Sequence, residues 1–267
     1  MKIRSMNLSL ALKKDKSQYI RRLDKLLKHG IFILGDEVKK FERDVTHYCN
    51  GTYSVGVSSG TDALILALKV LDIGKNDEVI IPDMSFVATA NAVSMTGAKP
   101  IFCDIKSDFN IDETQISTLI TSKTKAIIPV HYGGKISDMN KILMIAKKYN
   151  LKVVEDASQA FGALYKGRMA GTIGDIGCFS LNPMKMLGAL GEAGLITVNS
   201  YEKYIKLISL RANGLDENRK CIYQSFNAKM DPIQASFLRF KLKKLEKNIQ
   251  KRNKIATYFT KNLKHLV

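Results

Sequence analysis

Apolar and polar positions follow two different periods along this chain. Short apolar runs, many of them β-branched, predict buried strands at 53–57, 78–82 and 151–154. Between such runs, segments such as 36–49 and 139–149 repeat apolar positions every three or four residues, as amphipathic helices do. This alternation of strand and helix predicts an α/β fold with a largely parallel central sheet that is covered by helices on both faces.

The remaining expected elements continue the same alternation. The chain has 267 residues, of which 45% are hydrophobic, so it is long enough to bury one large core. Further strands are expected at 100–104, 125–130, 176–179 and 195–198, and further helices at 87–95, 113–119, 201–212 and within 230–263.

The chain is strongly basic, with 42 Lys plus Arg against 25 Asp plus Glu and a net charge of +17. That excess raises nucleic acid as a possible partner. The charge is spread widely, apart from a concentration between 241 and 254, and no nucleic-acid recognition motif accompanies it. We therefore favour a solvated basic surface that attracts anionic small molecules, and rank nucleic-acid binding as the weakest hypothesis.

The cysteines, the histidines and the short apolar runs argue against a disulfide-linked, metal-binding, secreted or membrane-spanning protein. Cys49, Cys103, Cys178 and Cys221 form no CxxC pair and lie mostly in apolar segments, which is typical of reduced core thiols. The four histidines show no metal-ligand spacing, so we expect no metal. The amino-terminal apolar run is too short for a signal peptide, and no run approaches about 18 apolar residues. We expect a cytoplasmic protein with no membrane partner.

Lys185 is the first candidate for chemistry. It follows the predicted strand 176–179 and precedes a glycine-rich loop, in which glycines let the backbone approach a bulky group. The strand is expected to carry Lys185 into the interior, where burial lowers the pKa of a lysine and makes its amine a nucleophile toward carbonyl groups. A solvated lysine on a mobile loop is the alternative interpretation.

Three other features accompany this lysine. The loop 58–61 opens a helix, whose free amides favour a phosphate, although capping of the helix is the commoner reason for its hydroxyls. Asp156 ends a predicted strand, with Gln159 one turn later, and ligands gather at such carboxyl ends. Phe86 follows another strand, as a core residue or as a ring that stacks on a flat ligand.

Together these residues match what pyridoxal phosphate requires of a protein. The cofactor needs an anchor for its phosphate, a stacked ring, a carboxylate for its pyridine nitrogen and an amine for its aldehyde. Each signal is weak alone, whereas their occurrence together is specific.

The chain also resembles a known family over nearly its whole length. The runs GDEVKKFERDV, GVSSGTDALILAL, GKNDEVIIPDMSFVATANAV, TKAIIPVHYGG, VVEDASQAFGALYKG, GDIGCFSLNPMKMLGALGEAG and NAKMDPIQASFLRFKL are similar to the DegT/DnrJ/EryC1/StrS family of sugar aminotransferases. The resemblance implies the aspartate-aminotransferase fold (fold type I) and a homodimer whose active sites lie at the subunit interface. It implies pyridoxal 5'-phosphate as the cofactor, glutamate as the amino donor and a nucleotide-linked keto sugar as the acceptor.

The resemblance also assigns roles to residues. Lys185 matches the lysine that bonds the cofactor's aldehyde and then shuttles a proton, Asp156 the partner of the pyridine nitrogen, and Gln159 the neighbour of the ring hydroxyl. Relatives with His in place of this lysine are dehydratases, so Lys185 favours amino transfer.

The remaining matches concern the ring and the phosphate. Phe86 falls where the family stacks an aromatic residue, and the phosphate-binding positions are matched by Gly60, Thr61, Ser180 and, from the other subunit, Asn227.

Two departures from the family pattern bear on activity. The loop 191–194 reads GEAG where the family more often has GEGG, and relatives continue beyond 267 into a small C-terminal domain that completes the sugar site. We expect residues 1–236 to form the cofactor-binding large domain, and 237–267 a connecting helix with the start of a largely missing small domain. The leading hypothesis is an aminotransferase of surface polysaccharide, lipopolysaccharide or other glycan synthesis. The alternative is a catalytically incompetent, cofactor-binding remnant with an interaction or regulatory role.

Overall fold

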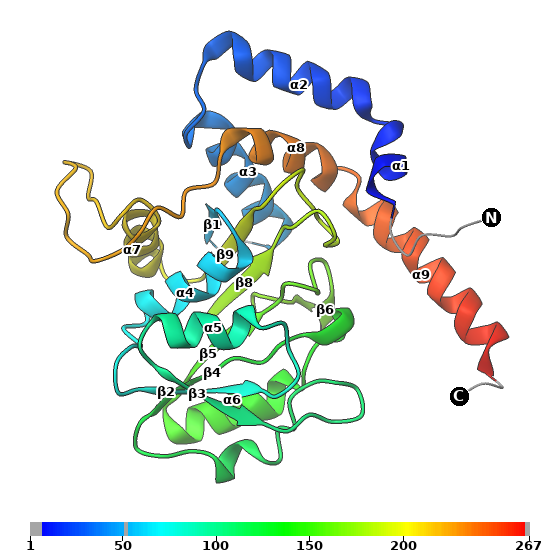
Figure 1. Ribbon diagram of the computed structural model, residues 1–267. Helices are drawn as coiled ribbons and strands as arrows, with labels where there is room; N and C mark the ends of the chain where they lie inside the picture. Colours follow the sequence, from blue (N-terminus) through cyan, green and yellow to red (C-terminus); the bar gives the residue numbers. More distant parts are fainter. Residues whose placement is uncertain (1–6, 51–52, 265–267) are drawn as a thin grey trace.

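A seven-stranded sheet forms the centre of the protein, whose computed structural model describes residues 7–50 and 53–264 (Figure 1). The strand order is β1-β9-β8-β5-β4-β2-β3, and β9 runs antiparallel to both of its neighbours while the other pairings in this sheet are parallel. The mostly parallel sheet that the sequence predicts is therefore present. The strands are β1 (Tyr53–Val57), β2 (Glu78–Pro82), β3 (Lys99–Cys103), β4 (Thr124–Ile127), β5 (Lys152–Asp156), β8 (Ile176–Ser180) and β9 (Gly194–Val198), and a separate hairpin pairs β6 (Leu164–Tyr165) with β7 (Arg168–Met169).

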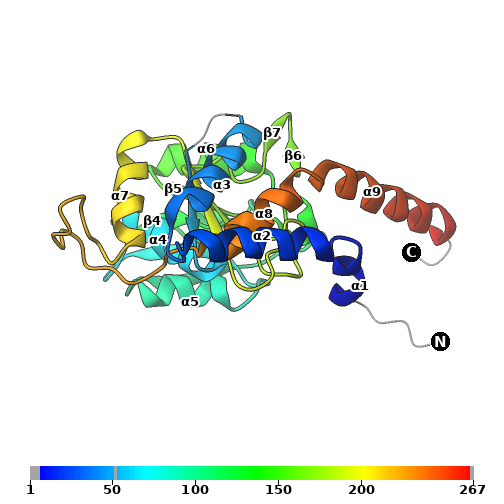
Figure 2. The ribbon, with the colours of Figure 1, turned by 90° about the horizontal axis from the view of Figure 1, so that it is seen from above.

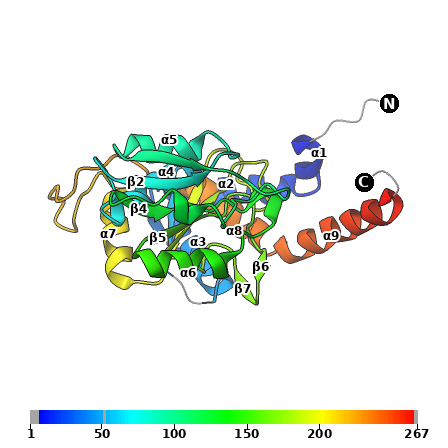
Figure 3. The ribbon, with the colours of Figure 1, turned by 90° about the horizontal axis from the view of Figure 1, so that it is seen from below.

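Helices cover both faces of the sheet, since each strand directs alternate side chains to opposite sides. Figure 3 shows α5 (Ala88–Met95) and α6 (Met139–Tyr149) on opposite sides of β2 and β4. Apolar residues of α4 (Gly60–Val70), α5 and α7 (Tyr201–Arg211) form one core with the sheet. On the other face, α3 (Gly35–Tyr48) and α8 (Pro232–Leu242) form a second core, and α6 forms a third.

The two ends of the chain add further helices. α1 (Leu8–Lys13) precedes α2 (Lys16–His29), whose Tyr19 ring contacts Phe237 of α8 edge to face at a centroid distance of 5.2 Å. α9 (Leu245–Asn262) follows α8 and extends away from the sheet (Figure 2). Among the described residues, no helix combines the length and the apolar character that crossing a membrane requires.

The structure differs from the expected elements in three places. The helix expected at 113–119 is only a 3-10 turn, Ile116–Thr118. It follows a turn in which Asp112 accepts the amide and the hydroxyl of Thr114. The strand expected at 125–130 ends at Ile127, near Pro129, which has no amide to donate.

The third difference lies at the ends. The segment 230–263 contains two helices, since Lys243 and Lys244 form a turn between α8 and α9. α8 runs through the expected domain boundary between 236 and 237. The sequence analysis did not predict α1 and α2. α2 has the apolar period of an amphipathic helix, but it buries only two of its residues, Tyr19 and Leu26.

Glu155 is a completely buried acid in β5 that joins three segments. Its Oε1 accepts the amides of Ile173 and Gly174, both at 2.6 Å, and its Oε2 accepts the amide of Gly171 at 2.8 Å. His131 lies 2.9 Å from the same Oε2, and the Ser137 amide donates to its Nδ1, which leaves Nε2 as the donor to Glu155.

We expect Glu155→Gln to lower the free energy of unfolding by about 3 kcal/mol, because the new amide group would face backbone donors that need an acceptor. Urea denaturation followed by circular dichroism measures the loss, and Glu202→Gln, at an exposed position of α7, is the matched control. Equal stability of the two variants would contradict the role given to Glu155.

The cysteines differ in exposure. Cys49, Cys103 and Cys178 are buried free thiols, as expected, whereas Cys221 is exposed and departs from that expectation. Burial raises the pKa of Cys49 and of Cys103 to about 12, and that of Cys178 well above its ordinary value. The reactive thiolate is therefore suppressed at the three buried positions near neutral pH.

We predict that a maleimide reagent labels the native chain rapidly at Cys221 alone, and all four cysteines after unfolding in urea. Peptide mass spectrometry identifies the labelled sites, and Cys221→Ser should remove the rapid phase. Rapid native labelling of Cys49 would show that its surroundings open more readily than this core allows.

Candidate active site

The candidate residues meet at one edge of the sheet. Since β1, β2, β5 and β8 run in the same direction, the segments that follow them emerge at the same edge. These segments carry the candidate site residues that the sequence analysis identified. The edge is also where open α/β sheets bind their ligands.

Asp156 is the last residue of β5, and its side chain is buried, with 5% exposed. Its Oδ2 accepts the hydroxyl of Thr89 from α5 at 2.9 Å, and its Oδ1 accepts the amide of Ser158 at 3.1 Å. The ion pairs formed by the described residues do not include Asp156. A buried carboxylate held by two neutral donors is suited to pair with a cationic nitrogen of a ligand.

Lys185 lies in the loop after β8, where its amide donates to the carbonyl of Asn182 at 2.9 Å. The side chain is half-buried and lines a cavity of about 810 Å³ together with Gln159. The expectation of a lysine sealed in the interior is therefore wrong. The chain brings Lys185 to a cavity wall, and complete burial would have to come from a ligand or from another chain.

Gly60 and Ser180 lie against each other at the start of α4. A Cβ added to Gly60 would come within 2.7 Å of the Ser180 Cβ, so this close approach requires glycine. Ser59 caps the helix by accepting the Asp62 amide at 3.0 Å. The amides of Gly60 and Thr61 donate to no acceptor among the described residues, as expected for a first helical turn. They offer a phosphate two free donors beside the Ser180 hydroxyl.

Phe86 and Asn227 are both exposed. The Phe86 ring follows β2 and is 72% exposed, which excludes a core role in this chain. Asn227 lies next to Ala228, whose amide donates to the carbonyl of Arg211 at 3.0 Å. The structure thus leaves a ring free to stack at the sheet edge. The Asn227 side chain accepts the Lys229 amide through its Oδ1 at 3.4 Å, and its Nδ2 donates to no acceptor among the described residues.

Gln159 is oriented by the loop after β4. Its Oε1 accepts the amide of Gly133 at 3.0 Å, and the adjacent Tyr132 amide donates to Oδ1 of the buried Asn110 at 3.1 Å. The segment containing Asn110 is in turn fixed by a buried acid, Glu113.

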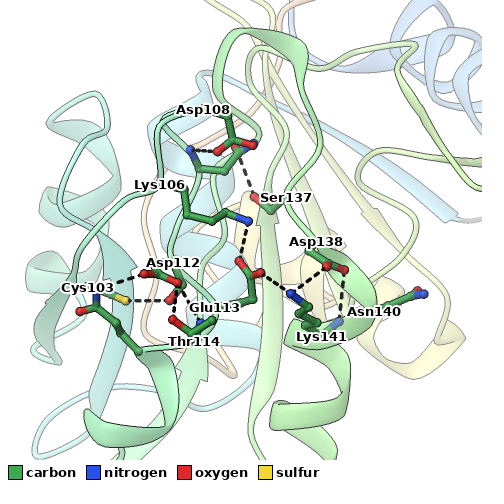
Figure 4. Close-up of polar contacts among 12 residues, drawn as sticks. Cys103, Lys106, Asp108, Asp112, Glu113, Thr114, Ser137, Asp138, Asn140 and Lys141 are labelled. Carbon is green, nitrogen blue, oxygen red and sulfur yellow. Dashed lines mark hydrogen bonds and ion pairs between the residues drawn. The ribbon is translucent and has the colours of Figure 1, made fainter.

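Glu113 lies between two lysines (Figure 4). Its carboxylate pairs with Lys106 at 2.6 Å and with Lys141 of α6 at 2.9 Å. Burial raises the pKa of Glu113, but the hydrogen bonds from the two ammonium groups outweigh it and hold that pKa below its usual range. These ion pairs hold the segment that contains Asn110, which in turn binds the Tyr132 amide next to the Gly133 contact of Gln159.

Sequence reasoning missed several residues of the site. The Thr89 hydroxyl donates to Asp156, and the Ser158 hydroxyl accepts the Ser180 amide. Neither residue stands out in the sequence pattern. α9 also lines the cavity of Lys185, with Ile249, Arg252 and Asn253 among the lining residues. Contacts between distant elements are what a single sequence does not display.

The donor set fits pyridoxal phosphate. One sheet edge carries an amine on a cavity wall, an exposed aromatic ring and, as far as the described residues show, a buried carboxylate without a cationic partner and two free helix amides. These groups correspond to the ring nitrogen, the aldehyde, the phosphate and the flat face of the cofactor.

Comparison with known proteins gives consistent matches. The model of the DegT/DnrJ/EryC1/StrS aminotransferase family matches residues 13–267. A dTDP-3-amino-3,6-dideoxy-alpha-D-galactopyranose transaminase of Aneurinibacillus thermoaerophilus is 43% identical over 91% of this chain and 67% of its own. A pleiotropic regulatory protein of Geobacillus stearothermophilus is 38% identical over 100% of this chain and 72% of its own.

Solved structures share the fold. The crystal structure of NtdA from Bacillus subtilis with bound cofactor PMP superposes with a TM-score of 0.93, at 37% identity, over 99% of this chain and 61% of that one. The predicted fold type is therefore confirmed.

We expect Gly60→Ala to weaken pyridoxal phosphate binding by about tenfold or more, since the new methyl group would push Ser180 away from the helix start. Equilibrium dialysis or absorbance titration gives the dissociation constant. Thr61→Ser keeps the hydroxyl at the next position and is the control. Equal affinity of the Gly60→Ala variant and the parent chain would place the phosphate elsewhere.

Proposed function

The chain belongs to the DegT/DnrJ/EryC1/StrS aminotransferase family, whose cofactor is pyridoxal phosphate, and we propose that it moves an amino group from glutamate to a nucleotide-linked keto sugar. The observation that carries the proposal is the placement of Lys185 and Gln159 on one cavity wall, at the edge where Asp156 ends β5. The likeness to a dTDP-amino-sugar transaminase supports the substrate class.

The roles of the residues follow from their positions. When bound, pyridoxal phosphate supplies an aldehyde that bonds amines and a ring that accepts electrons. Asp156, oriented by Thr89, keeps a proton on the ring nitrogen, because a buried anion favours the protonated pyridine. Lys185 would hold the cofactor through its aldehyde, and its amine, when free, would take up and return the proton at the substrate carbon. Gln159, held by the Gly133 amide, hydrogen-bonds the ring hydroxyl.

The other residues bind without moving protons. The exposed ring of Phe86 stacks on the cofactor, and the start of α4 with Ser180 holds its phosphate. In a homodimer, Asn227 reaches the phosphate of the second subunit. We propose that residues 1–236 hold the cofactor and that 237–267 connect this domain to a small C-terminal domain.

The setting is part of the same proposal. The reaction serves surface polysaccharide, lipopolysaccharide or another glycan and takes place in the cytoplasm. The alternative, a catalytically incompetent regulatory remnant, is less favoured because every group that the cofactor requires is present here.

We predict that Lys185→Ala abolishes the covalent adduct that borohydride captures between pyridoxal phosphate and the chain, because no other amine is placed on that cavity wall next to Gln159 among the described residues. Peptide mass spectrometry locates the adduct, and Lys220→Ala, at an exposed position, is the control. An unchanged adduct in Lys185→Ala would refute the assignment.

Asp156→Asn should retain the adduct but slow conversion of the cofactor by glutamate to its pyridoxamine form by about a hundredfold or more, because the amide does not keep the ring nitrogen protonated. Single-turnover absorbance with glutamate gives the rate. A panel of keto sugars on different nucleotides, read by mass spectrometry, then identifies the acceptor. Failure of the parent chain to convert the cofactor would favour the regulatory alternative.

A further inference from the structure

The loop that carries Lys185, residues 181–193, is closed at its base by backbone hydrogen bonds. The amide of Leu181 donates to the carbonyl of Ala193 at 2.8 Å, and the amide of Ala189 donates to the carbonyl of Leu181 at 2.7 Å. Asn182 also donates from its side chain to Glu192 at 2.7 Å. These bonds fix the two ends of the loop and leave the position of its tip to other contacts.

Gly188 lies directly behind the turn of Lys185. A Cβ added to Gly188 would come within 2.6 Å of the Pro183 carbonyl oxygen and 2.8 Å of that of Asn182. The Asn182 carbonyl is the one that accepts the Lys185 amide. Any shift of Gly188 would therefore be transmitted to the turn that presents Lys185.

Lys241 of α8 donates from its Nζ to the carbonyl of Gly188. The Lys241 side chain is half-buried, and burial lowers the pKa of Lys241 with no carboxylate to offset it among the described residues. Even partial burial of an unpaired charge costs free energy, so packing alone gives no reason for this lysine.

A second side chain of α8 contacts the same loop. Oε1 of Gln234 accepts the amide of Leu190 at 2.9 Å. Gln234 and Lys241 are seven residues apart, which is about two helical turns, so they lie on the same face of α8. One helix face thus holds both sides of the glycine-rich segment that follows Lys185.

We propose that Lys241, with Gln234, is a positioning residue that clamps the Lys185 loop to α8 and so presents the reactive amine to its cavity. The relevance of the clamp to catalysis rests on the proposed function, whereas the clamp itself does not. Lys241 positions the Lys185 loop, although burial of its charge lowers the stability of the fold. A residue with a purely structural role would instead raise that stability.

The test compares Lys241→Met, which removes the donor and the charge, with Lys241→Gln, which keeps a donor. Lys243→Met, at an exposed neighbouring position, is the matched control. Hydrogen exchange of the cofactor-free chain is followed at the amides of Lys185 and Ala189 by NMR spectroscopy or fragment-resolved mass spectrometry. Urea unfolding is measured on the same samples.

In Lys241→Met, we expect exchange at these two amides to be about tenfold faster, the size of effect that loss of one hydrogen bond produces. Global stability should be equal to or higher than that of the parent, because the buried charge is gone. Trapping of pyridoxal phosphate on Lys185 should also slow. Lys241→Gln should restore slow exchange, and Lys243→Met should match the parent.

Unchanged exchange at Lys185 and Ala189 in Lys241→Met would overturn the clamp. If global unfolding of that variant obscures the loop, Gln234→Leu tests the second contact, and normal exchange at Leu190 in that variant would equally overturn it. If exchange is faster in Lys241→Met but the parent chain never bonds pyridoxal phosphate, the clamp is supported and the proposed function is refuted.

Discussion

The alternation of side chains at the end of β5 is the constraint on which the rest of the site depends. Glu155 and Asp156 are consecutive, so their carboxylates point to opposite faces of the sheet. Glu155 is saturated by three backbone amides and His131, and it joins β5 to the turn 171–174 and to the loop after β4. Within the described part of the chain, Asp156 accepts only the hydroxyl of Thr89 and one amide, and it retains capacity for a ligand. A slip of one residue in β5 would exchange these two roles.

Much of the fold could be predicted from the sequence, because parallel strands buried on both faces read as continuous apolar runs. The strands at 53–57 and 78–82 have the expected bounds, and Asp156 and Phe86 follow the carboxyl ends of their strands as expected. The prediction was wrong at 113–119, where the expected helix is a single 3-10 turn that follows the Asp112–Thr114 turn.

The contacts that orient the site could not be predicted in this way. Thr89 reaches Asp156 across 67 positions of sequence, and Lys241 reaches Gly188 across 53. Nothing in the local pattern marks either residue, because a threonine in a short helix and a lysine in a basic helix are ordinary. The packing of α5 and α8 against their neighbours brings these donors to their acceptors. Such packing depends on the whole chain, so a local pattern does not reveal it.

The error about Lys185 has a physical cause that extends to its neighbours. The amine at 185 is half-buried and the Phe86 ring 72% exposed, whereas Thr89 is 1% exposed and Glu155 is fully buried. A chain that must bind a cofactor cannot fill that space itself, so its reacting groups stay accessible while the groups that orient them are held in the core. Low exposure was therefore the wrong criterion for the proposed nucleophile. The informative signature is an accessible amine whose backbone is fixed by buried partners, as the Asn182 carbonyl and Lys241 fix the loop of Lys185.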